Sequence, residues 1–350
     1  MKLEGVHRRS IERTADGRGA RIMDQRRLPW EIVWVELRSA DDAARAIKEM
    51  WTRGAPLIGA TAAYGLAMAL ADDPSDAGLD AAHAMLLATR PTAVNLRRAL
   101  DIVAAEVRPL PPQERAEAAF ARADAICDED VALNRSIGEH GLALFRELHA
   151  RNPDRPLNIL THCNAGWLAT VDYGTALSPI YLAHDAGIPL HVWVDETRPR
   201  NQGALLTAFE LQGHGVPHSV IADNVGGLLM QRGQVDLVIV GTDRVTANGD
   251  VCNKIGTYLK ALAAADSGVP FYVALPYTTF DPDMASGDLV PIEERDPAEL
   301  AELVGPDTDG ATRTVRVTAS PAFNPAFDVT PARLVTGYVT ERGVLAQIGD

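Results

Sequence analysis

Short apolar runs recur through the second half of the chain, and segments with helical periodicity separate them. The runs are Leu157–Thr161, Leu190–Val194, Ser219–Ala222, Val235–Val240 and Phe271–Leu275. Their length and β-branched content are typical of buried parallel strands. The intervening segments are short enough for right-handed crossovers, and they are Leu177–Ala186, Ala204–Leu211, Val225–Gln231 and Lys254–Ala265. The pattern predicts an α/β fold over residues 151–350, a doubly wound, mostly parallel Rossmann-like sheet, with Arg333–Thr340 as an edge strand.

The first half of the chain has a different pattern. Arg21–Asp24 and Glu31–Leu37 have strand character and predict a small antiparallel sheet. Helical periodicity then dominates, over Ala43–Thr52, Leu57–Leu70, Ala77–Thr89, Ala93–Val107 and Pro112–Ala150, the last expected to be broken in places. Residues 1–150 are therefore predicted to form an N-terminal domain with a small antiparallel sheet and a helical bundle. Two domains also suit a chain of 350 residues, which exceeds the usual size of a single core.

The stretch Val235–Thr257 organises the predicted sheet. Its strand ends before Asp243, which therefore lies at the edge of the sheet where ligands usually bind. After the turn residues 248–250, a helix is expected from Lys254, so that Asn253 and Lys254 stand at a helix N-terminus whose free N–H groups attract an anion. Ordinary capping is the alternative for this pair.

Polar residues also follow the other predicted strands, with His162-Cys163-Asn164 after the first. Backbone N–H groups near the sulfur of Cys163 would favour a thiolate, whereas the alternative is a small buried hydrophobic residue. Asp243 has two interpretations as well. Burial against apolar strand residues would raise its pKa and make it a general acid, while exposure would leave it a cap or an ion-pair partner.

Arg53, Gly54 and Ala55 precede Pro56 at the start of a predicted helix. A guanidinium beside free helix N–H groups, with glycine allowing close backbone approach, suits a phosphate. Alternatively, Arg53 interacts with the carboxyl end of the preceding helix. Arg90 similarly ends one helix, and Thr92 can cap the next.

Composition narrows the function classes. A net charge of −14 and the absence of a polybasic run argue against nucleic-acid binding. Three cysteines without a CxxC pair fit a reducing compartment, and with no signal-like or membrane-spanning segment we expect a cytoplasmic protein. No GxGxxG, GxxxxGK[ST], HxxH or HExxH pattern occurs, so neither a nucleotide cofactor nor a metal is expected. The polar segment Asp281–Thr312 is interpreted as a solvated loop, with a mobile lid as the alternative.

Several motifs together resemble those of one enzyme family, the methylthioribose-1-phosphate isomerases of methionine salvage. The resemblance runs from about Asp24 to Gly343 in matching order. The motifs are Arg53–Gly59 (RGAPLIG), Arg90–Leu96 (RPTAVNL), His162–Gly166 (HCNAG), Glu196–Gly203 (ETRPRNQG), Gly241–Arg244 (GTDR), Asn248–Thr257 (NGDVCNKIGT) and Asn324–Pro331 (NPAFDVTP).

The resemblance implies an aldose–ketose isomerase without a cofactor that acts as a homodimer on a sugar phosphate. Cys163 and Asp243 would be its catalytic residues. In the mechanism that we favour, protonated Asp243 donates to the ring oxygen while the Cys163 thiolate removes the C2 proton. A hydride shift from C2 to C1 is the alternative. The implied substrate-binding residues, mostly at the phosphate, are Arg53, Gly54, Ala55, Arg90, Gln202, Asn253 and Lys254.

Three other functions remain open at the level of sequence. Trp167 replaces a small residue found in many relatives, and residues 274–280 are less typical, so 5-deoxyribose 1-phosphate is an alternative substrate. Ribose 1,5-bisphosphate would need a further basic group, which Trp167 and Tyr277 do not offer. The wider superfamily also includes regulatory subunits of a translation-initiation exchange factor, so a non-catalytic sensor of a sugar phosphate or nucleotide is the alternative of a different class.

Overall fold

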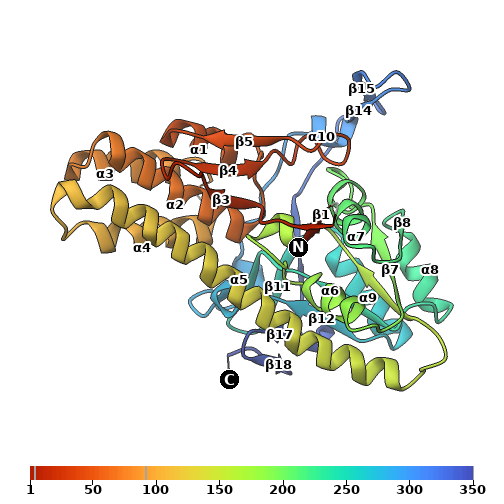
Figure 1. The fold of residues 1–350 in the computed structure, drawn as a ribbon. Coiled ribbons are helices and arrows are strands. Elements are labelled where there is room, and N and C mark those ends of the chain that lie inside the picture. The colour runs from red at the N-terminus through yellow and green to blue at the C-terminus, as the bar shows by residue number, and fades with distance from the viewer. Residues whose placement is uncertain (4, 91–92, 350) are drawn as a thin grey trace. The chain divides into compact units, whose positions relative to one another are not determined.

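The computed structural model describes residues 1–3, 5–90 and 93–349, and it divides into two compact units (Figure 1). Unit 1 comprises Met1–Gly138 and Ala165–Ser178, and unit 2 comprises Glu139–Asn164 and Pro179–Asp350. The division expected at residue 150 stays a prediction about folding domains. The compact units instead divide within α5 (Pro112–Ala150), which is one continuous helix of 39 residues and not the broken segment we expected.

Unit 1 contains the expected small antiparallel sheet, extended by one strand. Its order is β3-β4-β5, formed by β3 (Ile11–Arg13), β4 (Ala20–Met23) and β5 (Trp34–Leu37). A further hairpin joins β1 (Lys2–Leu3) to β2 (Val6–His7). The helices are α1 (Ala40–Lys48), α2 (Ala55–Asp72), α3 (Asp76–Leu87) and α4 (Val94–Val107), with a 3-10 turn η1 at Trp167–Ala169. The cap expected at Thr92 lies outside the described residues.

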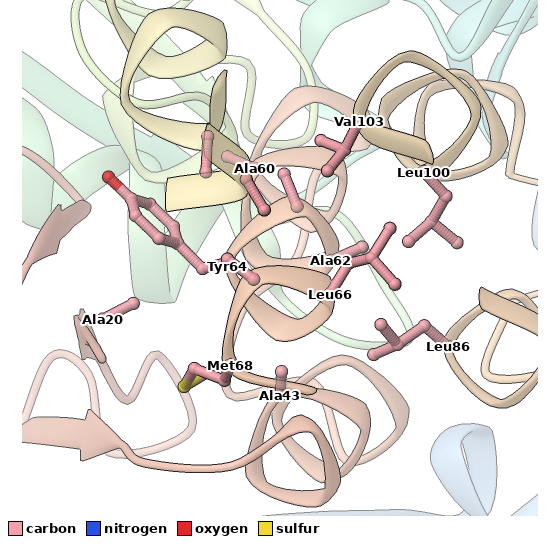
Figure 2. Close-up of a cluster of buried hydrophobic side chains, with 14 of the residues drawn as sticks. Ala20, Ala43, Ala60, Ala62, Tyr64, Leu66, Met68, Leu86, Leu100 and Val103 are labelled. Atoms are coloured by element: carbon pink, nitrogen blue, oxygen red, sulfur yellow. The ribbon is translucent and has the colours of Figure 1, made fainter. Parts of the chain in front are cut away.

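Helix α2 is the centre of the core of unit 1. Figure 2 shows Ala60, Ala62, Tyr64, Leu66 and Met68 of this helix surrounded by side chains of its neighbours. Glycines allow those neighbours to come close: a Cβ at Gly65 would lie 2.8 Å from the Ala43 side chain of α1. By length and composition α2 would be able to cross a membrane, but 72% of its apolar window is buried inside the protein, as in the core helix of a soluble domain.

Unit 2 is built on a seven-stranded sheet of order β18-β17-β12-β9-β6-β7-β8. All neighbours pair in parallel except β17 and β18. Thus the predicted doubly wound sheet is confirmed, although the expected edge strand is internal and β18 forms the edge. The strands are β6 (Leu157–Thr161), β7 (Leu190–Asp195), β8 (His218–Ile221), β9 (Leu237–Val240), β12 (Phe271–Ala274), β17 (Gly337–Thr340) and β18 (Gly343–Leu345).

The helices of unit 2 occupy the predicted segments between the strands. They are α6 (Ser178–Asp185), the π-helical turn η2 (Gly203–Thr207), α7 (Ala208–His214), α8 (Val225–Gln231) and α9 (Thr257–Ser267), with short 3-10 turns η3 (Tyr277–Thr279), η4 (Gly287–Leu289) and η5 (Ala332–Leu334). In the strand order, β6 lies between β7 and β9. The chain order therefore reverses between β6 and β9, which is the topological switch point where doubly wound sheets bind ligands.

A second, four-stranded sheet of order β13-β10-β11-β16 corrects one prediction. Residues 248–250 make a hairpin turn between β10 (Arg244–Thr246) and β11 (Val251–Lys254), where a helix was expected to start at Lys254. The outer strands are β13 (Phe280–Asp281) and β16 (Phe327–Thr330). Gly249 has φ +86° and permits the turn, and β16 pairs with all of β11, so residues 251–254 are extended and α9 begins only at Thr257.

The polar segment expected to be a solvated loop is partly ordered. It contains α10 (Ala298–Ala301) and leads into an antiparallel hairpin of β14 (Glu302–Pro306) and β15 (Thr312–Arg316). Two arginines of the 197–202 loop hold α10: Arg198 donates to the Leu300 carbonyl at 2.8 Å, and Arg200 pairs with Glu299 at 2.9 Å.

Candidate active site

Cys163 follows β6 and has an uncommon backbone conformation for a residue other than glycine. Its φ is +64°, in the left-handed region, where a side chain costs roughly 1 kcal/mol or more. Two threonine hydroxyls hold the residue: its N–H donates to Thr197 Oγ1 at 2.8 Å, and its carbonyl accepts from Thr207 Oγ1 at 2.7 Å. Cys163 is half-buried, and these two bonds fix its backbone.

Asn164 anchors the other side of Cys163. The Asn164 side-chain amide is buried and donates to Glu210 Oε1 at 2.8 Å and to Thr207 Oγ1 at 3.2 Å. Glu210 on α7 is itself buried and accepts from the hydroxyl of Tyr181 on α6 at 2.6 Å. These bonds satisfy a buried carboxyl group and tie the loop after β6 to two helices.

Asp243 lies after β9, the strand that pairs with β6 at the switch point. Its backbone N–H donates to the Cys252 carbonyl at 3.0 Å, which joins this loop to β11. Its side chain is exposed in this structure, so of the two interpretations of Asp243 the one that needs burial against apolar strand residues does not hold for the chain as described. Cys252 is the buried group there, and burial raises the pKa of its thiol to about 12.

Gln202, Asn253 and Lys254 belong to the same unit as the two catalytic candidates. Gln202 precedes η2 and is buried, and its Oε1 has no hydrogen-bond partner among the described residues. Asn253 is also buried, and its amide donates to Thr257 Oγ1 at 3.0 Å. Lys254 Nζ lies 4.8 Å from the centroid of the Phe327 ring, a cation–π distance.

The N-terminus of α9 does not provide the open anion site that we expected. The Asp328 carboxylate of β16 accepts from the backbone N–H groups of Gly256 at 2.7 Å and Tyr258 at 3.2 Å. This side chain therefore neutralises the first turn of the helix from within the unit. Burial raises the pKa of Asp328, and the two backbone donors oppose that effect.

Arg53, Gly54, Ala55 and Arg90 belong to unit 1. Gly54 is the N-cap of α2 with φ +89°, and a Cβ there would lie 2.2 Å from the Ala169 carbonyl oxygen, so only glycine fits. Arg53 lies just before the cap, as predicted, but the helix begins at Ala55, one residue earlier than the Pro56 start that we expected. Arg90 follows the end of α3 and is half-buried.

Sequence reasoning missed the residues that support Cys163. Thr197 and Thr207 act through hydroxyl bonds to its backbone, and Thr197 N–H in turn donates to Asp223 Oδ1 at 2.7 Å. No local pattern marks such partners, because Cys163 follows β6 whereas Thr197 and Thr207 both follow β7 and Asp223 follows β8. The one available signal was that these segments come after strands of the same sheet, at the same edge as Cys163.

His162, Asp195 and Asp223 lie close enough together to be considered as metal ligands. Their donors already have partners that a metal would displace. The Lys260 ammonium lies 3.0 Å from Asp195 Oδ2, while the Asp223 carboxylate accepts from the backbone N–H groups of Thr197 and Arg198. The Lys260 ammonium thus takes the place that a metal ion would occupy, and the three side chains do not fit a metal site.

Comparison with known proteins gives consistent matches over the whole chain. The Initiation factor 2 subunit family matches residues 51–347. The methylthioribose-1-phosphate isomerase of Paramagnetospirillum magneticum is 64% identical over 98% of this chain and 96% of its own length. That of Methylorubrum extorquens is 61% identical over 98% and 95%.

Solved structures of the same family have similar folds over nearly the whole chain. The 5-methylthioribose 1-phosphate isomerase of Pyrococcus horikoshii OT3 has a TM-score of 0.84 and 40% identity, over 97% of this chain and 92% of that one. The delta subunit of translation initiation factor eIF-2B from A. fulgidus has a TM-score of 0.82 and 37% identity, over 97% and 96%. The chain therefore belongs to the Initiation factor 2 subunit family, close to members named methylthioribose-1-phosphate isomerase.

Proposed function

We propose that this protein is an aldose–ketose isomerase of methionine salvage that converts 5-methylthioribose 1-phosphate to 5-methylthioribulose 1-phosphate. The observation that carries the proposal is 64% identity to a methylthioribose-1-phosphate isomerase over 98% of the chain. The positions of Cys163 and Asp243 support it, since they follow the paired strands β6 and β9 at the switch point of the sheet.

The chemistry needs an acid because a sugar phosphorylated at its anomeric carbon cannot open spontaneously to an aldehyde. Asp243 donates a proton to the ring oxygen as the bond from C1 to that oxygen breaks. Cys163 as thiolate removes the C2 proton, and the C2–H electrons form a C1–C2 double bond. The thiol then returns a proton to C1, the C2 hydroxyl proton returns to the Asp243 carboxylate, and both groups are regenerated.

The exposure of Asp243 has a consequence for this mechanism. Asp243 is exposed in this structure, so bound substrate must exclude water from its carboxyl group before it can serve as the proton donor. Gln202, Asn253 and Lys254 are the proposed substrate-binding residues of unit 2, and the buried Gln202 Oε1 is suited to accept from a sugar hydroxyl. Arg53, Gly54, Ala55 and Arg90 are the proposed phosphate ligands of unit 1.

One assay tests the substrate. We expect turnover of 5-methylthioribose 1-phosphate with a kcat/KM at least about tenfold above that of 5-deoxyribose 1-phosphate. Ribose 1,5-bisphosphate serves as the third substrate. A protein that binds all three without forming a ketose would be a sensor, and the proposal would fail. Running the reaction in deuterated water tests the route, because solvent deuterium at C1 of the product indicates proton transfer whereas a hydride shift carries none.

The proposed setting is the cytoplasm, and the proposed assembly is a homodimer. The three cysteines are free, as expected for a reducing compartment. Light scattering after size exclusion tests the assembly: a dimer has twice the chain mass of 37.6 kDa.

A further inference from the structure

The side chain of His162 is buried, and each of its ring nitrogens faces an oxygen that accepts hydrogen bonds. Nδ1 lies 2.8 Å from Asp195 Oδ2, and Nε2 lies 2.8 Å from the Ile255 backbone carbonyl oxygen. A carbonyl oxygen has no hydrogen to give, so Nε2 must donate to Ile255. The protonation of Nδ1 then depends on whether Asp195 is ionised.

The position of Lys260 indicates that Asp195 is ionised. Its ammonium lies 3.0 Å from the same Asp195 oxygen, so this oxygen accepts from a cation and the carboxyl group is ionised. An ionised carboxylate can only accept, and Nδ1 must therefore donate to it. The hydrogen-bond geometry therefore has both ring nitrogens donating, which is the pattern of an imidazolium.

The charged groups around this ring come from several elements. Asp195 ends β7 and Lys260 lies on α9, while Asp223, after β8, offers an oxygen within 4.8 Å of the His162 and Asp195 ligand atoms. Asp328 on β16 also lies close enough for His162 to act on its charge. Three carboxyl groups thus surround two cations, which is the balance that a buried imidazolium needs.

The ring also occupies a closely fitted position. A Cβ at Gly256 would lie 2.9 Å from His162 Cε1, and Gly256 has φ +102°. Because Gly256 follows Ile255, the bond from Nε2 fixes the connection between β11 and α9. His162 therefore joins the loop that carries Cys163 to the connection that follows Asn253 and Lys254.

We propose that His162 is a positioning residue, a fixed imidazolium that orients the loop of Cys163, its neighbour in the chain, and that its charge favours the thiolate form of this residue. The catalytic part of this inference rests on the proposed isomerase function, but the charge and the thiol reactivity do not. A positive charge next to a thiol raises the thiolate fraction and hence its rate of alkylation. Cys127 and Cys252 are buried, so alkylation in the folded protein reports on Cys163.

The experiment compares iodoacetamide alkylation of the full chain with that of two variants, and the modified residue is located by mass spectrometry. H162N keeps a donor near the Nδ1 position, and H162Q keeps one near the Nε2 position, but both lose the charge. At neutral pH we expect each to be alkylated at Cys163 roughly tenfold more slowly than the wild type, because the thiolate loses the stabilising effect of the positive charge. In the isomerase assay kcat should fall while KM changes little.

His191→Gln is the matched control. His191 lies on β7 of the same sheet, half-buried, and burial together with the nearby His218 lowers its pKa, so it is neutral. This variant should be alkylated at the wild-type rate. Wild-type alkylation rates in both folded His162 variants would overturn the inference.

A spectroscopic measurement keeps the inference testable if neither variant folds. In wild-type protein with ¹⁵N-labelled histidine, one ring should show two slowly exchanging N–H signals at neutral pH. A spectrum in which no histidine ring has two protected N–H groups would overturn the inference. If the wild type turned over none of the sugar phosphates, the proposed function would fail, but alkylation and the spectrum would still decide the state of His162.

Discussion

Two residues carry the proposed chemistry, and the structure gives them different surroundings. Threonine hydroxyls hold the backbone of Cys163 on both sides, whereas the side chain of Asp243 is exposed. If they are the base and the acid, Cys163→Ala and Asp243→Asn should each lower kcat at least about a hundredfold with little change in melting temperature. Steady-state kinetics and a thermal melt of each variant measure both quantities.

Cys127→Ala and Asp266→Asn are suitable controls for that prediction. Cys127 is a buried thiol of α5 in unit 1, and burial raises its pKa far above the ordinary range. Asp266 is an exposed carboxylate near the end of α9. Both should retain kcat, and near-normal activity in either site variant would remove that residue from the mechanism.

A smaller effect is expected at Thr197, whose hydroxyl accepts from the backbone N–H of Cys163 and donates to the Asp195 carbonyl. Thr197→Val keeps the shape of the side chain but removes the hydroxyl that accepts from the Cys163 N–H. We expect kcat to fall about tenfold, because the sulfur loses part of its orientation, and the melting temperature to fall slightly. Thr336→Val, which removes a similar hydroxyl bond to the Phe271 N–H in the same sheet, should leave kcat unchanged. An unchanged kcat in Thr197→Val would show that this bond does not position the thiol.

At the level of elements, the start of α2 depends on one glycine. Gly54→Ala would place a methyl group 2.2 Å from the Ala169 carbonyl oxygen and 2.5 Å from its Cα, both in the backbone of η1. We expect a loss of about 3 kcal/mol in the free energy of unfolding, from overpacking added to the strain of a positive φ. Urea denaturation followed by circular dichroism measures it.

Gly187→Ala separates the two contributions. Gly187 has a similar φ of +78°, but no atom of the described residues lies within 4 Å of the position that a Cβ would take there, so only strain remains. A loss of about 1 kcal/mol is expected for this variant. Equal losses in the two variants would mean that η1 moves aside without cost.

Some strands and helices could be predicted from the sequence, and others could not. Five of the six parallel strands of the sheet were predictable because continuous β-branched runs have few other interpretations. Residues 251–254 could not be recognised as a strand, because the apolar pattern of a four-residue strand next to a helix resembles that of the helix. Only pairing with β16, some seventy residues later, distinguishes the strand from a helix. Length and polarity alone also suggested breaks in α5, where the structure has none.

In the candidate site, too, features set by local sequence could be predicted, and features set by distant contacts could not. Cys163 and Asp243 could be placed because each comes directly after a strand, and topology then sets them side by side at the switch point. The left-handed φ of Cys163 and the partners of His162 depend on contacts distant in sequence. The exposure of Asp243 likewise depends on the three-dimensional arrangement around β9.

For the whole molecule, Asp130 makes stability depend on pH. Burial raises the pKa of this carboxyl to about 7, although the Val171 N–H donates to it at 2.7 Å, and Asp172 adds repulsion. The folded pKa lies above the unfolded value of about 3.9, so the full stability is present below pH of about 4 and is lost as pH rises through about 7. That shift corresponds to about 4 kcal/mol at most, and partial solvent access reduces our expectation to about 2 kcal/mol.

Asp130→Asn removes the titration while keeping an acceptor for Val171. Relative to the wild type, the variant should gain about 2 kcal/mol in the free energy of unfolding as the pH rises from about 4 to about 8. Denaturant titrations at both pH values measure the difference. Asp128→Asn, at an exposed position two residues away, should follow the wild type at both. Parallel behaviour of Asp130→Asn and the wild type would mean that Asp130 does not titrate in this range.

The carboxylate of Asp328 at the start of α9 has a practical consequence for how the protein meets ions in its surroundings. Sulfate, free phosphate and other common anions are repelled from a turn whose amide groups are already used. The start of α9 is thus closed both to the inorganic ion and to an esterified sugar, and the proposed phosphate ligands Arg53, Gly54, Ala55 and Arg90 belong to other parts of the chain.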